Sequence, residues 1–511
     1  MAEVLSAICF GGLTGKTVTL TIASPCVVSL ATHGLRPGAG IQLSTSGALP
    51  TGLVPNTTYY VGNVARGTFN LYDTKANAIA GGATGKINTS GTQSGTHTVK
   101  SAVMLATDLS RYGSTRVYDG IASWNSGRSG ASAYDTEIAE VLEPFTDTLT
   151  AKLTLSIPSA KSILTSKING ARGAGFHGGV KPTSSLTTLA LENGYVLATE
   201  TWLSNYLLTL NRYRDTLDGI CLINAAAGGV YNMVKLAAGQ ARLANCIVYC
   251  ITPNNGGVYM SAALSECVNN RIYGFSGVGI DIVGSVSAGV FVCNNTVVKN
   301  GTGLQTQTSA LGFYYNNVIV GNTTNWSPAT MPTGVEGASN NCTPTGQGWS
   351  KGGGPLINIA TTDFADYANN NFYPASVSSP QVESGISPYG YPTEDIAGRE
   401  RPNYMNGGAE AMDIGADEFD HGYGNHPATA TINLTSIVSG SQVRITKDTD
   451  GAVIYNNAPG ASLAFSTSYI GGFSVTVRKA SASPYYREFN ASGTTVAGQT
   501  TTIKCLQQLD E

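Results

Sequence analysis

Asparagine returns at a nearly fixed interval through the middle third of this sequence. The repeated residues are 21 to 25 positions apart, and each lies beside a short run of β-branched or aromatic residues. Repetition at this interval is typical of a solenoid, because one repeat cannot bury its own apolar side and needs a neighbour on each side. The sequence therefore predicts stacked coils over this region. The repeated residues are Asn224, Asn245, Asn270, Asn295 and Asn317.

Each repeat joins an asparagine to a short strand, as in NCIVYC from Asn245 and NNTVVKN from Asn294. Asparagine tolerates the left-handed backbone of a corner and can bond its own backbone. Because successive coils lie about 4.8 Å apart, the five repeated asparagines are expected to stack into one ladder of side-chain amides. The strand residues expected to point into a shared interior are Ile247, Ile272, Val297 and Ile319.

These repeats predict an all-β protein built on a right-handed parallel β-helix, with the hand inferred from the preferred twist of the chain. Only 12% of the 511 residues are charged, and 62 are glycine and 20 proline, so turns are many and amphipathic helices few. A net charge of −3 gives no electrostatic case for nucleic acid. No apolar stretch is long enough to cross a membrane, so neither kind of partner is expected.

The sequence divides into four parts. Residues 1–100 form short strands separated by glycine and proline, and predict an N-terminal β module for attachment or interaction. Residues 101–134 are a connector, in which Trp124 is expected to cover the open end of the first coil. Residues 135–420 are the solenoid, with at most roughly a dozen coils. Six alternating runs in residues 421–511 predict a C-terminal β-sandwich.

The N-terminal residues and the cysteines indicate where such a chain is made. Glu3 stands where a secretory leader would be basic, so we expect no leader. The nine cysteines are odd in number and show no C-x-x-C spacing, which favours reduced thiols in a protein made in a cytoplasm.

Several ordered motifs resemble modules of tailed-bacteriophage virion proteins. The connector string YGSTRVYDGIASWNSG and the C-terminal runs are similar to parts of such proteins. The resemblance implies a virion structural protein, a tail spike or tail fibre that forms a homotrimer, contacts other virion proteins and attaches to a host surface glycan. A capsid decoration or head fibre protein and a polysaccharide depolymerase remain the alternatives. The N-terminal motifs are His33-Gly34-Leu35, Gly38, Leu49-Pro50-Thr51-Gly52-Leu53, Thr58-Tyr59-Tyr60-Val61 and Thr68-Phe69-Asn70-Leu71.

A second resemblance concerns the end of the solenoid. The string IAGRERPNYMNGGAEAMDIGADEF is similar to the terminal segment of many β-helix proteins. The likeness implies that Arg401 pairs with Asp413 or Glu418 and so satisfies the exposed polar groups of the last coil. This is a structural cap and says nothing about a reaction.

Candidate catalytic residues are few, and we predict no enzyme, cofactor or metal, although a glycan lyase or hydrolase stays open. Glycoside hydrolysis needs two facing carboxyl groups, and Asp218 and Glu266, two coils apart, are the best pair. The acids from Asp135 to Asp147 are interpreted as a solvated edge, and His177 as a structural residue.

Coil tyrosines could stack on sugars, but the core or an interface is the expected place for each. They are Tyr206, Tyr213, Tyr231, Tyr249, Tyr259, Tyr273, Tyr314 and Tyr315.

Overall fold

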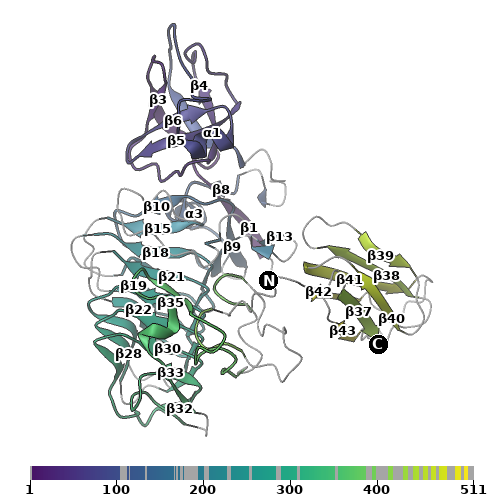
Figure 1. Ribbon diagram of the computed structural model, residues 1–511. Coiled ribbons are helices and arrows are strands. Elements are labelled where there is room, and N and C mark those ends of the chain that lie inside the picture. The colour runs from purple at the N-terminus through teal and green to yellow at the C-terminus, as the bar shows by residue number, and fades with distance from the viewer. Residues whose placement is uncertain are drawn as a thin grey trace. The chain divides into compact units, whose positions relative to one another are not determined.

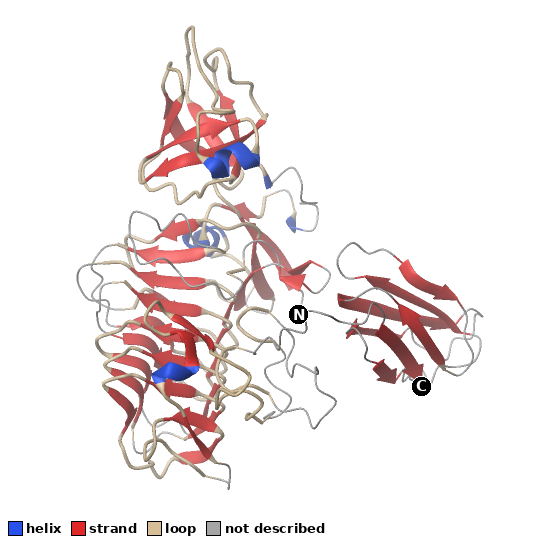
Figure 2. Ribbon diagram, viewed as in Figure 1, coloured by secondary structure: helices blue, strands red, loops and turns tan. Residues whose placement is uncertain are grey.

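A computed structural model of the chain shows an all-β protein with only short helices (Figure 2). The residues that it describes are 3–103, 112–113, 115–132, 135–165, 167–168, 171–172, 176–177, 194–200, 206–226, 232–251, 256–283, 289–307, 311–351, 355–386, 394–398, 412–417, 430–435, 441–447, 453–457, 462–467, 471–479, 489–495 and 500–504.

A parallel β-solenoid forms the middle of the chain and confirms the predicted fold class (Figure 1). A complete coil gives one strand to each of three parallel sheets, and each strand pairs with the strand one coil further on. Seven coils have a strand in all three sheets.

The three sheets differ in length. Sheet 1 has ten strands, β8 (Val117–Tyr118), β1 (Glu3–Ile8), β9 (Thr136–Val141), β12 (Ala160–Thr165), β17 (Thr216–Asp218), β20 (Arg242–Ala244), β23 (Glu266–Val268), β26 (Val290–Cys293), β29 (Gly312–Tyr315) and β32 (Val335–Ser339). Sheet 2 has nine, β10 (Thr146–Thr148), β15 (Val196–Thr199), β18 (Cys221–Asn224), β21 (Ile247–Cys250), β24 (Arg271–Tyr273), β27 (Thr296–Val298), β30 (Val318–Val320), β33 (Asn341–Thr343) and β34 (Leu356–Asn358). Sheet 3 has seven, β11 (Leu153–Thr154), β16 (Leu208–Leu210), β19 (Asn232–Leu236), β22 (Gly256–Met260), β25 (Val278–Ile282), β28 (Thr302–Thr306) and β31 (Thr324–Ser327).

Columns of apolar side chains fill the interior, one residue per coil. On sheet 2, three of the four residues predicted to point inward lie in one column and are fully buried, but Ile247 does not. Ile247 pairs with Arg271 and packs on the outer face, while Val248 takes the inward place. The predicted register was wrong by one position. Because successive residues of a strand point to opposite faces, this slip moves Ile247 from the interior to the outer face. The inward column is Val248, Ile272, Val297 and Ile319.

The N-terminal module is a closed barrel, with strands in the order β2-β3-β6-β5-β4-β7. Residues 1–100 were predicted as one module, but β1 pairs with β9 along its whole length and therefore belongs to the solenoid. In the barrel, Thr74 caps α1 (Lys75–Ala80) through its side chain, and Gly81 ends that helix with a φ of 69°. The barrel strands are β2 (Lys16–Leu20), β3 (Val27–Ser29), β4 (Gly40–Thr45), β5 (Thr58–Ala65), β6 (Thr68–Tyr72) and β7 (His97–Ser101).

A short helix, α3 (Ile121–Gly127), covers the first coil. Trp124 is fully buried in the solenoid core, and the Asn125 side chain bonds the backbone of Thr154 and Ser156 next to β11. The sequence predicted that Trp124 would cover the first coil at this place.

Residues that follow the last coil run back along the outer face of sheet 2 instead of adding coils. The segment contains η3 (Thr361–Asp363) and a hairpin of β35 (Phe364–Asp366) and β36 (Asn371–Pro374). Its apolar residues pack on outward residues of sheet 2 to form a second core. The seven complete coils lie within the predicted limit of roughly a dozen, and the described residues of this segment pack on the side of the solenoid instead of extending it.

The second compact unit combines residues 420–511 with the inserted hairpin of β13 (Lys167–Ile168) and β14 (Ala171–Arg172). Its two sheets, β40-β37-β43 and β39-β38-β41-β42, share one hydrophobic core, as expected for a β-sandwich. The strands are β37 (Ala430–Thr435), β38 (Ser441–Lys447), β39 (Val453–Asn457), β40 (Leu463–Thr467), β41 (Gly471–Lys479), β42 (Phe489–Thr495) and β43 (Thr500–Lys504).

Candidate functional site

An asparagine ladder lies at the corner between sheet 1 and sheet 2. Asn270, Asn295, Asn317 and Asn341 are all fully buried, and each side-chain amide donates to the next one at 3.0 Å. The same Oδ1 atoms accept the backbone N–H of the preceding member, at 2.9 to 3.1 Å. The ladder therefore satisfies backbone groups as well as amides at every coil.

Two of the predicted ladder residues lie elsewhere. Asn245 is one position early and, with a φ of 52°, occupies the left-handed turn, while Cys246 takes the ladder place and donates its N–H to Asn270. Asn224 ends β18, where it pairs with Cys250 and its Oδ1 accepts from the Ala226 N–H. Asn245 is a single asparagine, and spacing alone could not show which member of the Asn-Asn pairs in the later coils it corresponds to. The left-handed column is Asn245, Asn269, Asn294, Asn316 and Asn340.

A second ladder, between sheets 2 and 3, was not predicted. Asn300 donates to Asn322 at 3.1 Å, Asn322 to Asn325 at 3.1 Å, and Asn325 to Gln347 at 2.7 Å. The asparagines that close the runs NNTVVKN and NNVIVGN are the signal that would have found it.

The predicted cap falls partly outside the described residues, where Arg401 and Glu418 lie. Asp413 is buried, its Oδ1 accepts from the Glu383 N–H at 2.6 Å, and its carbonyl accepts from Asn294. Because Asn294 belongs to an interior coil, Asp413 lies along the side of the solenoid and not at its end. An end-cap role for Asp413 is wrong.

A buried ion pair that the sequence did not predict fastens the same segment. Arg271 and Asp417 are 5% and 3% exposed, and the guanidinium bonds both carboxylate oxygens, one through Nε at 3.1 Å. Nearby, the Ala416 N–H donates to Thr296 at 3.0 Å and the Gly415 N–H to the Asn316 carbonyl at 2.8 Å. The residues Asp-Ile-Gly-Ala-Asp thus cross three coils.

The best carboxylate pair from the sequence does not form a catalytic site. Asp218 and Glu266 lie two coils and two strand positions apart, which separates their Cα atoms by about 12 Å. Each also has a neighbour: Asp218 accepts from Asn245 at 2.8 Å, and Glu266 lies 3.7 Å from Arg242. Both acids hold adjacent coils together.

The acids of the first coil are not a solvated edge, contrary to the prediction. Glu137 is fully buried and bonds Arg128 at 2.9 and 2.5 Å. Asp147 accepts from the Tyr195 hydroxyl at 2.7 Å and from the Ile121 N–H at 3.0 Å. These acids bind the helix and loops that close the first coil.

Other ionisable residues of the repeats are also structural. His177 is buried, and its Nε2 lies 2.7 Å from the Asn245 carbonyl, so it cannot act on an external substrate. Lys161 and Asp215 form a pair at 3.2 Å with no exposed side-chain surface. In the part of the chain that the structure describes, no group of three or more His, Cys, Asp or Glu is placed to hold a metal ion. None of the helices described there has the length and apolar character of a membrane span.

Glu143 joins the barrel to the solenoid. Its carboxylate accepts from the Phe10 N–H at 2.8 Å and the Ser101 hydroxyl at 2.7 Å, on the two chain segments that enter and leave the barrel. Burial raises the pKa of Glu143 to about 7, while those hydrogen bonds and Arg36 oppose the rise.

This pKa predicts a pH dependence of stability. Between about pH 4.5 and 7 the folded chain holds a proton on Glu143 that the unfolded chain has released, so the free energy of unfolding should fall as pH rises. Wild type should lose about 2 kcal/mol relative to Glu143→Gln between pH 5 and 7.5, measured by urea unfolding. If the free energy of unfolding changes equally with pH in the two proteins, the pKa of Glu143 is not raised.

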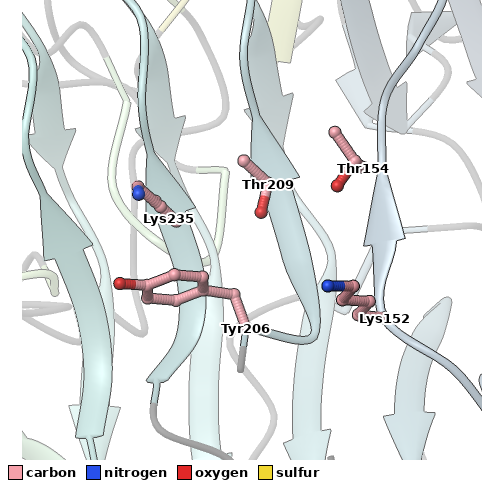
Figure 3. A pocket seen from close by; sticks show the side chains of 5 residues that line it. All are labelled: Lys152, Thr154, Tyr206, Thr209 and Lys235. Atoms are coloured by element: carbon pink, nitrogen blue, oxygen red, sulfur yellow. The ribbon is translucent and has the colours of Figure 1, made fainter. Parts of the chain in front are cut away.

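An open depression on the outer face of sheet 3 is the candidate functional site (Figure 3). Its volume is about 230 Å³, below the range of pockets that enclose a drug-sized ligand, so it suits part of a ligand laid across the sheet. Figure 3 shows Lys235 above the ring of Tyr206, with Lys152 on the far side of Thr209. The lining residues are Lys152, Thr154, Tyr206, Thr209 and Lys235.

The strand register explains why these polar residues gather. Thr154, Thr209 and Lys235 are successive Cα partners in the outward column of sheet 3. The inward neighbours of this column, such as Val234 and Leu236, are fully buried in the core. The column continues through Tyr259, Asp281, Gln305 and Ser327.

Two tyrosine rings hold the lysine at the centre of the depression. The Lys235 ammonium lies 5.0 Å from the ring centroid of Tyr206 and 5.5 Å from that of Tyr259, within cation–π range. The two centroids are 5.3 Å apart. Burial and the proximity of Tyr259 and Asp281 raise the pKa of Tyr206 to about 12.

The coil tyrosines fall into two groups. Tyr249, Tyr273 and Tyr314 are buried, as the sequence suggested for coil tyrosines in general. Tyr206, Tyr259 and Tyr315 are half-buried, and Tyr213 is 54% exposed. Tyr231 lies outside the described residues. Of the half-buried tyrosines, Tyr206 and Tyr259 are the two that lie beside Lys235 at the depression.

Comparison with known proteins gives only a weak likeness in structure. No family model matches the sequence, and no curated protein matches it. Among solved structures, the pectin methylesterase of Aspergillus niger is similar over 49% of this chain and 91% of its own, with a TM-score of 0.27 and 12% identity. Values this low do not extend a function from that enzyme to this chain.

Proposed function

We propose that this chain is a non-enzymatic structural protein of a tailed-phage virion, a spike- or fibre-like homotrimer that binds a host surface glycan through the depression on sheet 3. The phage assignment rests on the ordered N-terminal motifs and the connector described above. The glycan assignment rests on one observation, the exposed cluster of tyrosine rings, threonine hydroxyls and lysines on the side of the solenoid.

This chemistry suits carbohydrate. Tyrosine offers an apolar face for a sugar ring together with a hydroxyl, and the threonines add further hydrogen-bonding groups. A shallow site on a regular sheet also suits a polymer, since a long chain can pass across it without entering a cavity. Binding without cleavage fits the described residues, because Asp281 is the one carboxylate in the outward column from Thr154 to Ser327.

A glycan-binding assay tests the proposal directly. The purified protein should bind at least one surface glycan on an array of bacterial polysaccharides, and should release no reducing ends from it. Tyr206→Ala should weaken binding at least tenfold, because the ring and its support of Lys235 are both lost. Oligosaccharide release above buffer controls would favour a depolymerase instead.

Tyr213→Ala is a matched control for that variant. Tyr213 is also on the solenoid and is exposed, but it lies outside the depression and packs against Arg214. Its replacement should leave glycan binding unchanged. Equal losses in both variants would contradict the assignment of the site.

The virion role needs its own measurements. Light scattering should give a mass three times the 52.9 kDa of one chain. Immunogold labelling of intact particles should place the protein on the tail, whereas label on the shell would indicate a capsid decoration or head fibre protein.

A further inference from the structure

We infer that the depression on sheet 3 selects a sugar that carries a negative charge, a carboxylate or a phosphate. The inference rests on the proposed glycan-binding function and names its ligand class. Its basis is the charge of the lining, which has two ammonium groups and no carboxylate.

Neither lysine of the lining has an acidic partner in the part of the chain that the structure describes. Among the described residues neither Lys152 nor Lys235 forms an ion pair, whereas Lys161, Arg242 and Arg271 of the same solenoid each do. Only 12% of the residues of the whole chain are charged, so two lysines at one depression form a local concentration of positive charge. An anion placed between them would supply the missing partner.

Lys235 is held ready for such a ligand. Its side chain is half-buried, and the rings of Tyr206 and Tyr259 stabilise its ammonium without neutralising the charge. Holding the charge in place before binding reduces the entropy lost when the ligand arrives. Lys152 is exposed and can adjust to the position of the anion.

The neighbouring hydroxyls fit the same ligand. Tyr206 adds a hydroxyl that can donate a hydrogen bond at neutral pH, as tyrosine ordinarily does. Thr154 and Thr209 each add a hydroxyl that can donate to an anion or to a sugar oxygen. Asp281 lies outside the lining, two coils from Lys235 in the same outward column, and forms an ion pair with neither lysine.

An array of bacterial glycans that pairs acidic polymers with neutral ones tests the inference, with uronate polymers and their methyl esters in one arm and phosphorylated and plain mannans in the other. The full chain should bind glycans with one type of anion at least tenfold more tightly than their uncharged partners, and the arms show whether that anion is carboxylate or phosphate. Tighter or equal binding of neutral glycans would overturn the charge selection and leave the proposed function standing. No binding to any glycan would remove the proposed function itself.

Lysine variants give the second readout. The double variant Lys152→Gln, Lys235→Gln should lose at least tenfold in affinity for the acidic glycan and should lose the salt dependence of binding. Lys75→Gln, an exposed lysine on the barrel helix, should change neither. Unchanged affinity in the folded double variant would overturn the inference.

Discussion

Replacing Asn295 by alanine should lower the free energy of unfolding by about 3 to 5 kcal/mol. Its Nδ2 donates to the carbonyls of Cys267 and Cys293 at 2.8 and 3.1 Å, and its Oδ1 accepts the Asn270 N–H at 3.0 Å. All of these groups are buried, so alanine leaves several of them without a partner, at about 1 to 3 kcal/mol each. It also breaks the ladder between Asn270 and Asn317. Urea unfolding followed by circular dichroism would measure the loss.

Asn224→Ala is the informative control. Asn224 is equally buried and the sequence repeat treats it as equivalent, but its side chain makes one hydrogen bond, to the Ala226 N–H. Its loss should cost about 1 kcal/mol. If the two substitutions destabilise the chain equally, the amide ladder does not add the stability that its geometry indicates.

The fold could be predicted because the solenoid repeats one local pattern. A strand of β-branched residues after an asparagine turn recurs often enough to fix the architecture, even though hand alignment missed the register by one residue at Ile247. That register depends on which asparagine of a pair takes the left-handed turn. Only the stacking of a whole coil on its neighbour decides this, and it is not a property of one repeat.

The side buttress could not be predicted, because it depends on contacts between residues far apart in sequence. Arg271 and Asp417 are 146 positions apart, and the segment from Asp413 was recognised only as the end of a solenoid. One clue was present: Arg271 is the one charged residue in an outward column of otherwise uncharged residues. A cation at such a place requires a partner. The column is Cys221, Ile247, Arg271, Thr296 and Val318.

The depression was missed for a different reason. Tyr206 and Tyr259 were both considered as sugar-binding residues, but nothing in the sequence separated them from core tyrosines such as Tyr273. Aligning the runs NMVKL, GGVYM and VGIDI would have placed Lys235, Tyr259 and Asp281 at one outward phase. Of the strands of sheet 3, only β22 directly follows an Asn-Asn pair, so no recurring pair marks that alignment.

Replacing Arg271 by leucine should lower the free energy of unfolding by about 3 to 5 kcal/mol. The substitution leaves the Asp417 carboxylate 3% exposed and without its bidentate partner, and an unpaired buried charge is strongly destabilising. Because residues 412–417 also pack against Asn316 and Thr296, their release would expose part of the apolar outer face of sheet 2. Calorimetry would show the lowered melting temperature, and limited proteolysis should cut the chain first near this segment.

Two further variants separate the ion pair from general damage. Replacing Arg271 and Asp417 together, by leucine and asparagine, should destabilise the chain less than the sum of the single changes, because no charge is then left buried. Arg66→Ala removes the ion-pair partner of Glu200. Because the Arg66 side chain is 59% exposed, this change should alter the free energy of unfolding by less than about 1 kcal/mol. Should Arg271→Leu cost no more than Arg66→Ala, the segment from Asp413 to Asp417 would not be fastened through this pair, and packing alone would have to hold it against the coils.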